Sequence, residues 1–150
     1  MSDYIQGKVL KLFITQDNKE KVRQKMTDVT ADENGIVDDK FYSKNDQRAI
    51  LIASSKSYHI ANEHDIELQT GSLGENILID IDPYHLNAGE TLTIGNTILE
   101  ITQNCTLCKG LSSVNTKLPK LLKNDRGIFA KVISGDGNIS VGDVVIIPLH

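Results

Sequence analysis

The recurrence of short β-type segments is the feature that most restricts how this chain can fold. Strand candidates occupy residues 8–14, 48–53, 76–80, 91–94, 97–102, 128–133 and 144–147. Several are separated by glycine-containing turns, such as Gly95-Asn96 and residues 134–138. Strands spaced about 8 to 12 residues apart are typical of barrels and sandwiches. A parallel α/β sheet would need regular strand-helix alternation. We therefore expect a mainly β fold with a few helices, arranged as a closed or nearly closed β barrel.

Two segments predict helices within this β pattern. Residues 54–64 begin with serines that can cap a helix, and Tyr58, Ile60 and Ala61 could form its apolar stripe. Pro119 can begin a second, short helix that extends to Leu122.

Two further predictions concern the first strand, residues 8–14, and the polar segment at residues 17–32. Strict alternation would place Leu10, Leu12 and Ile14 on one face and Val9 with Phe13 on the other. Residues 17–32 are polar and highly charged. We expect this segment to be an exposed loop or a solvated edge.

Length and charge limit the classes of protein to consider. The 150 residues, 39% of them hydrophobic, suffice for one ordinary domain, which we expect to span residues 1–150. A net charge of -4 with interspersed signs argues against nucleic acid as a partner. No apolar run reaches the roughly 18 residues of a membrane span, and the N-terminus does not resemble a signal peptide. We expect no membrane association and a cytoplasmic location.

Sulfur chemistry in this chain depends on one Cys-Thr-Leu-Cys motif, because Cys105 and Cys108 are its only thiols. In a reducing cytosol such a pair is more often catalytic, redox-active or metal-binding than a structural disulfide. A complete zinc site would need histidine ligands in addition. None of the four histidines is spaced from Cys108 in a way that suggests a Cys-His dyad: His59, His64, His85 and His150.

A glycine-rich motif at residues 71–76 is the second candidate site. Gly71 and Gly74 allow a tight turn and a close approach of the backbone to a ligand. Glu75 offers an acceptor, and Asn76 offers both an acceptor and a donor. The same residues could instead form a plain hairpin turn.

Taken together, these motifs resemble the MOSC domain, the module named for the C-terminus of molybdenum cofactor sulfurases. The resemblance extends over about residues 7–148. It is carried by the order and spacing of several segments: residues 7–14, residues 35–39 with Arg48 and its apolar run, residues 71–77, Ile101-Thr-Gln103, Cys108, residues 126–132 and residues 139–143.

The resemblance implies a barrel-like fold with a functional cysteine near the end of a strand. In the family this cysteine carries sulfur as a persulfide or ligates the molybdenum of a molybdopterin cofactor. Its match here is Cys108, with Cys105 as a possible accessory thiol. The cysteine desulfurase domain of larger relatives, which uses pyridoxal phosphate, is missing from this sequence. A separate sulfur donor such as a cysteine desulfurase is therefore implied, together with molybdopterin or a molybdoenzyme as partner.

Both roles of Cys108, sulfur carrier and molybdenum ligand, need the deprotonated thiolate, and nearby cations would stabilise that form. Lys109, Arg48 and Arg126 are the candidates to lower the thiol pKa. The two arginines could instead bind a cofactor phosphate through both guanidinium nitrogens, or form ordinary ion pairs.

The resemblance also assigns Asp39, Glu75 and Asn76 to cofactor binding. The chain departs from the family pattern at two positions near Asp39. Asp38 stands where relatives commonly have glycine, and Phe41 stands where they have histidine. If that histidine assists proton transfer or cofactor binding in relatives, this chain lacks the group at that position.

Three functions are consistent with these residues. The first is sulfur transfer or molybdenum-cofactor binding through Cys108, as a sulfurtransferase-like protein or a molybdenum-dependent oxidoreductase that reduces N-hydroxylated substrates. The second is thiol-disulfide exchange by Cys105 and Cys108, although such pairs usually begin a helix in a βαβ unit. The third is a zinc-binding or small-ligand-binding module in which the two cysteines make half a tetrahedral site.

Overall fold

The computed structural model of the protein describes residues 3–16, 23–105 and 115–149. Its elements are β1 (Asp3–Thr15), β2 (Arg23–Met26), β3 (Asp28–Asp32), β4 (Gly35–Ile36), β5 (Ile50–Ser54), α1 (Ser55–Glu63), β6 (Ile77–Ile79), β7 (Thr91–Ile94), β8 (Thr97–Asn104), α3 (Leu118–Leu121), β9 (Ile128–Ser134), β10 (Asn138–Ser140) and β11 (Val144–Leu149).

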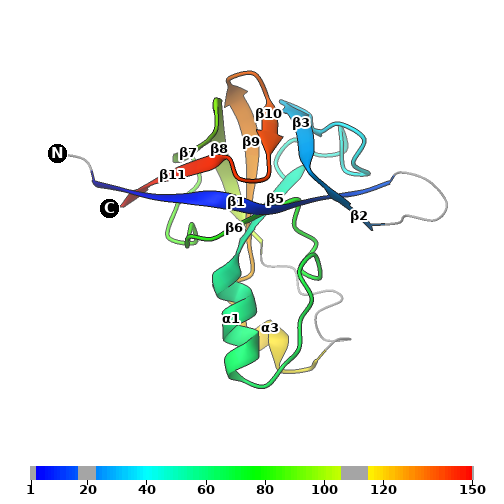
Figure 1. Ribbon diagram of the computed structural model, residues 1–150, viewed down its shortest axis with the longest axis vertical. Helices are drawn as coiled ribbons and strands as arrows, with labels where there is room; N and C mark the ends of the chain where they lie inside the picture. Colours follow the sequence, from blue (N-terminus) through cyan, green and yellow to red (C-terminus); the bar gives the residue numbers. More distant parts are fainter. Residues whose placement is uncertain (1–2, 17–22, 106–114, 150) are drawn as a thin grey trace.

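Seven of the described strands close into a barrel (Figure 1). Their order is β11-β7-β8-β9-β5-β6-β1, and β1 pairs back with β11 to complete the ring. The pairings in the ring are antiparallel except β5 with β6, which are parallel and joined through α1. The prediction of a mainly β, closed barrel with a few helices is confirmed.

The long strand β1 pairs with three partners in turn. Residues 3–8 pair with β11, residues 9–12 with β6, and residues 12–15 with β2. The register with β6 shifts between Val9 and Lys11, at a β-bulge. One inserted residue turns the following side chains to the opposite face. Val9, and not Leu10, therefore shares the barrel core with Leu12 and Ile14, which corrects the face expected for Leu10.

Much of the segment expected to be a loop or a solvated edge is regular β structure. Residues 17–22 lie outside the described residues. The short strand β2 lies at an edge of the large sheet, as expected, but β3 belongs to a second sheet with β10 and β4. Val29 and Ala31 of β3 are buried, because period-two alternation directs them into the core while polar neighbours face outward.

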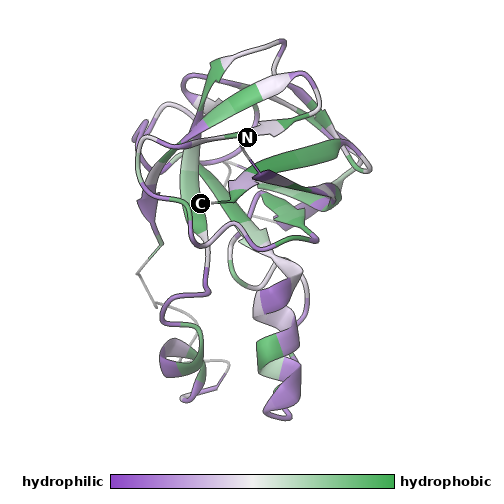
Figure 2. Cartoon of the chain, turned by 90° about the vertical axis from the view of Figure 1, so that its left-hand side faces the viewer, coloured by the Kyte–Doolittle hydropathy of each residue, from purple (hydrophilic) through white to green (hydrophobic). Residues whose placement is uncertain are grey.

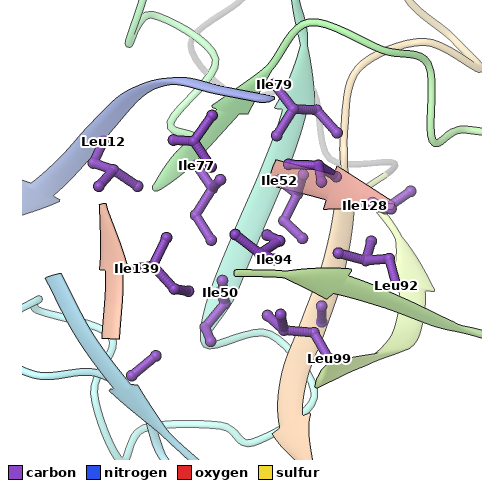
Figure 3. Close-up of a cluster of buried hydrophobic side chains, with 14 of the residues drawn as sticks. Leu12, Ile50, Ile52, Ile77, Ile79, Leu92, Ile94, Leu99, Ile128 and Ile139 are labelled. Atoms are coloured by element: carbon purple, nitrogen blue, oxygen red, sulfur yellow. The ribbon is translucent and has the colours of Figure 1, made fainter. Parts of the chain in front are cut away.

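The barrel interior is filled by aliphatic side chains from all of its strands. Figure 3 shows Ile50 and Ile52 of β5 among residues such as Leu12, Ile94 and Leu99. Every residue of β5 is buried. Both sides of the strand are packed, because Ile50 and Ile52 face the core, Ala53 belongs to the cluster around the helices, and Leu51 packs against Cys105 and Phe129.

The two described helices lie together at one end of the barrel (Figures 1 and 2). The side chain of Ser54 accepts a hydrogen bond from the Lys56 N–H and caps α1, as predicted. A proline in its first turn begins α3, also as predicted. Leu118 and Leu122 pack with Ala61 of α1 in a second apolar cluster. No helix in the described part of the chain is long and apolar enough to cross a membrane.

Candidate functional site

The candidate site lies on the outer face of the barrel, where β5, β9 and the end of β8 meet. Leu51 lies between two inward-facing isoleucines, so its side chain points outward, opposite Phe129 of β9. Cys105 follows β8 directly, and its N–H donates to the carbonyl of Gly127 at 3.0 Å. Leu51, Cys105 and Phe129 form a small buried cluster that is separate from the barrel core.

A pocket of about 490 Å³ opens above this cluster. The described residues that line it are Phe41, Lys44, Asn45, Arg48, Ala49, Leu51, Leu73, Gly74, Asn76, Cys105, Arg126 and Phe129. Three of these are cationic and none is acidic. The lining therefore combines apolar walls with positive charge, a composition suited to an anion that has an apolar part.

Arg126 is placed directly against the sulfur of Cys105. Its Nη1 donates a hydrogen bond to Cys105 Sγ. Its Nε is buried and has no hydrogen-bond partner among the described residues. No described carboxylate forms an ion pair with Arg126. The guanidinium thus keeps donor capacity beside the thiol.

Arg48 brings a second guanidinium to the pocket. Its N–H donates to the carbonyl of Asn45 at 3.0 Å, which fixes the turn just before β5. Its Cζ lies 5.2 Å from the centroid of the Phe129 ring. A planar guanidinium over an aromatic face is a favourable contact that leaves the edge N–H groups available. No ion pair between Arg48 and a carboxylate occurs in the described ranges.

Asn76 lines the same pocket but its amide joins two strands. Its Oδ1 accepts from the Leu51 N–H at 3.0 Å, and its Nδ2 donates to the Phe13 carbonyl at 3.2 Å. The Asn76 backbone also bonds to both of these residues. Asn76 therefore holds β5 and β1 in place at the pocket wall.

Glu75 is turned away from the pocket into a buried polar cluster. Its Oε2 accepts hydrogen bonds from the Tyr58 hydroxyl and from the Gly71 N–H. Its backbone carbonyl accepts from Arg23 Nη2. Oε1 of Glu75 and Nε of Arg23 are buried without partners in the described part of the chain. Burial lowers the pKa of the Arg23 guanidinium, although Glu75 and Asp39 oppose that shift.

Asp39 is likewise outside the pocket and organises the loop that leads to it. Its carboxylate accepts from the N–H groups of Thr15 at 2.8 Å and Phe41 at 3.2 Å. The preceding residue, Asp38, has φ +74, a conformation that favours glycine. The ring of Phe41 lines the pocket and is 47% exposed.

Comparison with known proteins identifies the family to which the chain belongs. The sequence model described as MOSC domain matches residues 39–146, which include the described pocket residues. The chain belongs to the MOSC domain family. No curated protein sequence matches it.

Solved structures show the same fold as this MOSC domain. The YuaD protein from Bacillus subtilis is 18% identical, with full coverage of both chains and a TM-score of 0.83. YiiM from Geobacillus stearothermophilus is 14% identical, with 96% of this chain and 75% of that chain covered and a TM-score of 0.70. YiiM from Escherichia coli is 16% identical, with 97% and 70% covered and a TM-score of 0.65.

The site residues expected from the sequence of this MOSC domain divide into three groups. Arg48, Asn76, Arg126 and the accessory Cys105 meet at the pocket. The carboxylates of Asp39 and Glu75 lie elsewhere and bind backbone or tyrosine groups. Cys108 and Lys109 lie outside the described residues. Residues 3–16, 23–105 and 115–149 contain no group of three His, Cys, Asp or Glu that could hold a metal ion.

Several pocket residues of the MOSC domain were not expected from the sequence. Leu51 belongs to a continuous apolar run, which does not reveal which side chains face outward. Phe129 lies in the family segment 126–132 but was not singled out within it, and Lys44 belongs to no motif. The replacement of the family's histidine by Phe41 was a further signal, because it marked a position that lines the pocket.

Two partly buried tyrosines, Tyr58 and Tyr84, predict how the stability of the MOSC domain depends on pH. Burial raises the pKa of Tyr58, and the charge of Glu75 raises it further. Burial also raises the pKa of Tyr84, which packs beneath α1 against Ser57. Each folded tyrosine therefore keeps its proton after the unfolded chain has lost it, above about pH 10. Stability should fall as pH rises through this range, by about 1.4 kcal/mol per pH unit for each tyrosine.

Urea unfolding from about pH 9 to about pH 11 measures this dependence. Tyr58→Phe should make the fall of unfolding free energy with pH less steep, by the contribution of one tyrosine, which is about 1.4 kcal/mol per pH unit. This change in slope is expected whatever the variant's stability at neutral pH. An unchanged slope in this variant would contradict the assignment.

Proposed function

We propose that this MOSC protein acts in molybdenum-cofactor chemistry, with its pocket as the cofactor site and Cys108 as the working thiol. The observation that carries the proposal is the pair of arginines, Arg48 and Arg126, in a pocket with no acidic residue among its described lining. Two guanidiniums that form no ion pair with a described carboxylate favour an anionic ligand, and the planar fork suits a phosphate.

The donor set fits a phosphate-bearing pterin cofactor. The buried Nε of Arg126 has no partner among the described residues, so the site offers a donor that the folded chain does not use. Leu51, Leu73 and Phe129 provide apolar walls for a flat ring system. Arg48 and Arg126 would hold the phosphate, and Cys108, three residues after Cys105 in the chain, would supply the sulfur ligand.

Each residue has a distinct task in this proposal. The arginines bind and orient the anionic end, the apolar walls exclude water, and the Cys108 thiolate holds sulfane sulfur or ligates the metal. When bound, the cofactor supplies a molybdenum centre that can exchange an oxygen atom with a substrate. Electrons would come from an external reductant, and sulfur from a separate donor such as a cysteine desulfurase. We place this function in a single cytoplasmic domain.

Metal analysis and intact-protein mass spectrometry test the proposal on chain purified from molybdenum-replete cells. Wild-type protein should retain molybdenum or carry a persulfide, and Cys108→Ala should lose both while its thermal unfolding is unchanged. Arg48→Gln should weaken cofactor retention about tenfold to a hundredfold, because a charge-assisted contact to phosphate contributes about 1.5 to 3 kcal/mol. Lys123→Gln, which removes a charge from an exposed residue outside the pocket, is the matched control.

Two results would overturn the proposal in favour of the other functions. Stoichiometric zinc in protein purified without added zinc would indicate a metal-binding module. A dithiol activity that disappears in Cys105→Ser as completely as in Cys108→Ala would indicate thiol-disulfide exchange.

A further inference from the structure

We infer that Arg23 is a positioning residue that fastens two walls of the pocket to each other from behind. One wall is the loop that contributes Gly74 and Asn76, and the other is the loop that contributes Phe41. Arg23 is not among the described lining residues, so it acts without touching the ligand. The inference rests on the proposed function only in treating this pocket as the ligand site, and it does not depend on which anion binds there.

One arm of the Arg23 guanidinium binds the glycine-rich loop. Its Nη2 donates a hydrogen bond to the backbone carbonyl of Glu75, the residue between Gly74 and Asn76. The loop also packs closely on the same group, because a Cβ built on Gly71 would lie 3.5 Å from Arg23 Nε. A displaced guanidinium would therefore move the backbone that carries both lining residues of this wall.

The other arm of Arg23 reaches the second wall through Thr15. Nη1 of Arg23 donates to Thr15 Oγ1 at 3.0 Å. The Thr15 backbone binds the second loop twice, since its N–H donates to Asp39 Oδ1 at 2.8 Å and its carbonyl accepts from the Lys40 N–H at 2.8 Å. Asp39 in turn accepts from the N–H of Phe41, whose ring lines the pocket. A continuous series of hydrogen bonds thus connects Arg23 to a lining residue.

The surroundings of Arg23 require a guanidinium and not merely a positive charge. Glu75 and Asp39 both act on it electrostatically, and a lysine could offset their charge equally well. Only a planar fork donates in two fixed directions at once, to the carbonyl of Glu75 and to Thr15. The fork is held over the Phe13 ring, with Cζ 5.2 Å from the ring centroid. Thr15, Asp39 and Glu75 are buried, so water would not readily replace a hydrogen bond lost among them.

Fluorine NMR of the full chain, labelled with para-fluorophenylalanine, tests the inference together with a titration of inorganic phosphate. The sequence has three phenylalanines, and Phe41→Leu identifies the resonance of Phe41. Arg23→Gln should shift that resonance and weaken phosphate binding about tenfold. Lys25→Gln is the matched control, because it removes a charge from an exposed residue of the same strand, and it should change neither readout.

Two further variants separate positioning from charge and from stability. Arg23→Lys keeps the charge but loses the fork, so it should restore thermal stability more fully than phosphate affinity. Thr15→Val removes the acceptor of one arm and leaves both backbone hydrogen bonds of Thr15 in place. It should shift the Phe41 resonance as Arg23→Gln does, and it carries the test if Arg23→Gln does not fold. Combining Thr15→Val with Arg23→Gln should weaken phosphate binding by less than the product of the single effects, because both break the same link.

An unchanged Phe41 resonance in folded Arg23→Gln or Thr15→Val protein would overturn the inference. So would a phosphate affinity equal to that of the wild type, or full recovery of both readouts by Arg23→Lys. A residue that only stabilised the fold would lower the unfolding temperature and leave both readouts unchanged. The proposed function fails separately: a wild-type chain that binds neither phosphate nor molybdenum would contradict it, and the Phe41 resonance would still decide the role of Arg23.

Discussion

Gly137→Ala should lower the free energy of unfolding by about 3 to 5 kcal/mol and can prevent folding altogether. Gly137 has φ +78, and a Cβ built on it would lie 2.1 Å from the carbonyl oxygen of Ala31. That contact is with backbone, so no side-chain rotation relieves it. The carbonyl of Gly137 accepts from the Ala31 N–H, and its own N–H donates to Thr97 Oγ1. The substitution would therefore disturb two hydrogen bonds as well as the backbone conformation.

Gly142→Ala separates the steric cost from the conformational one. Gly142 has φ +93, but a Cβ there would meet nothing within 4 Å. Its substitution should lower the free energy of unfolding only by the cost of placing alanine at a positive φ, about 1 to 2 kcal/mol. Urea unfolding of both variants and the wild type at neutral pH gives the comparison. Equal losses would show that the close approach at Gly137 is not what requires glycine.

Asn76→Asp is the second large effect, expected at about 2 to 4 kcal/mol. A carboxylate would still accept from the Leu51 N–H but would place a second acceptor oxygen against the Phe13 carbonyl. The site is buried, so water cannot supply the missing donor. Protonation of the new carboxyl would restore a donor. The loss of unfolding free energy should therefore be smaller near pH 4 than near pH 7, when Asn76→Asp is compared with the wild type at each pH.

Asn45→Asp is the matched control, since Asn45 also lines the pocket but is exposed. Its side-chain oxygen accepts from the Gln47 N–H at 2.9 Å, a bond that aspartate keeps. A change within about 0.5 kcal/mol is expected. If Asn76→Asp were equally mild but impaired ligand binding, the amide would be a ligand-binding group and not a brace between strands.

The barrel was predictable from sequence because its signals are local. Strand alternation, glycine turns and the capping serine each depend on neighbouring residues, and each leads to an element that the structure contains. The face of Leu10 was not predictable, because one bulged residue in β1 reverses the alternation and leaves no mark in the sequence.

The site was only partly predictable, because its contacts join distant segments. Arg126 and Cys105 are 21 positions apart and meet through the pairing of β8 with β9. The glycine-rich motif around Glu75 was recognised as a candidate site from the sequence. In the structure its neighbours Gly74 and Asn76 line the pocket, whereas the Glu75 carboxylate is bonded to Tyr58. Asp38 stands at a position where the resemblance predicts glycine. Its positive φ explains that preference, because glycine adopts such a conformation without steric cost.

The pairing of β1 with β11 has a consequence for synthesis of the chain. Residues 3–8 leave the ribosome well before their partners at 144–149, which follow more than a hundred residues later. Until then β1 and β7 each lack a neighbour, and both expose backbone donors and acceptors to other chains. Loss of β11 would make that exposure permanent, so a chain truncated before Val144 should aggregate during expression even though the pocket residues are all present.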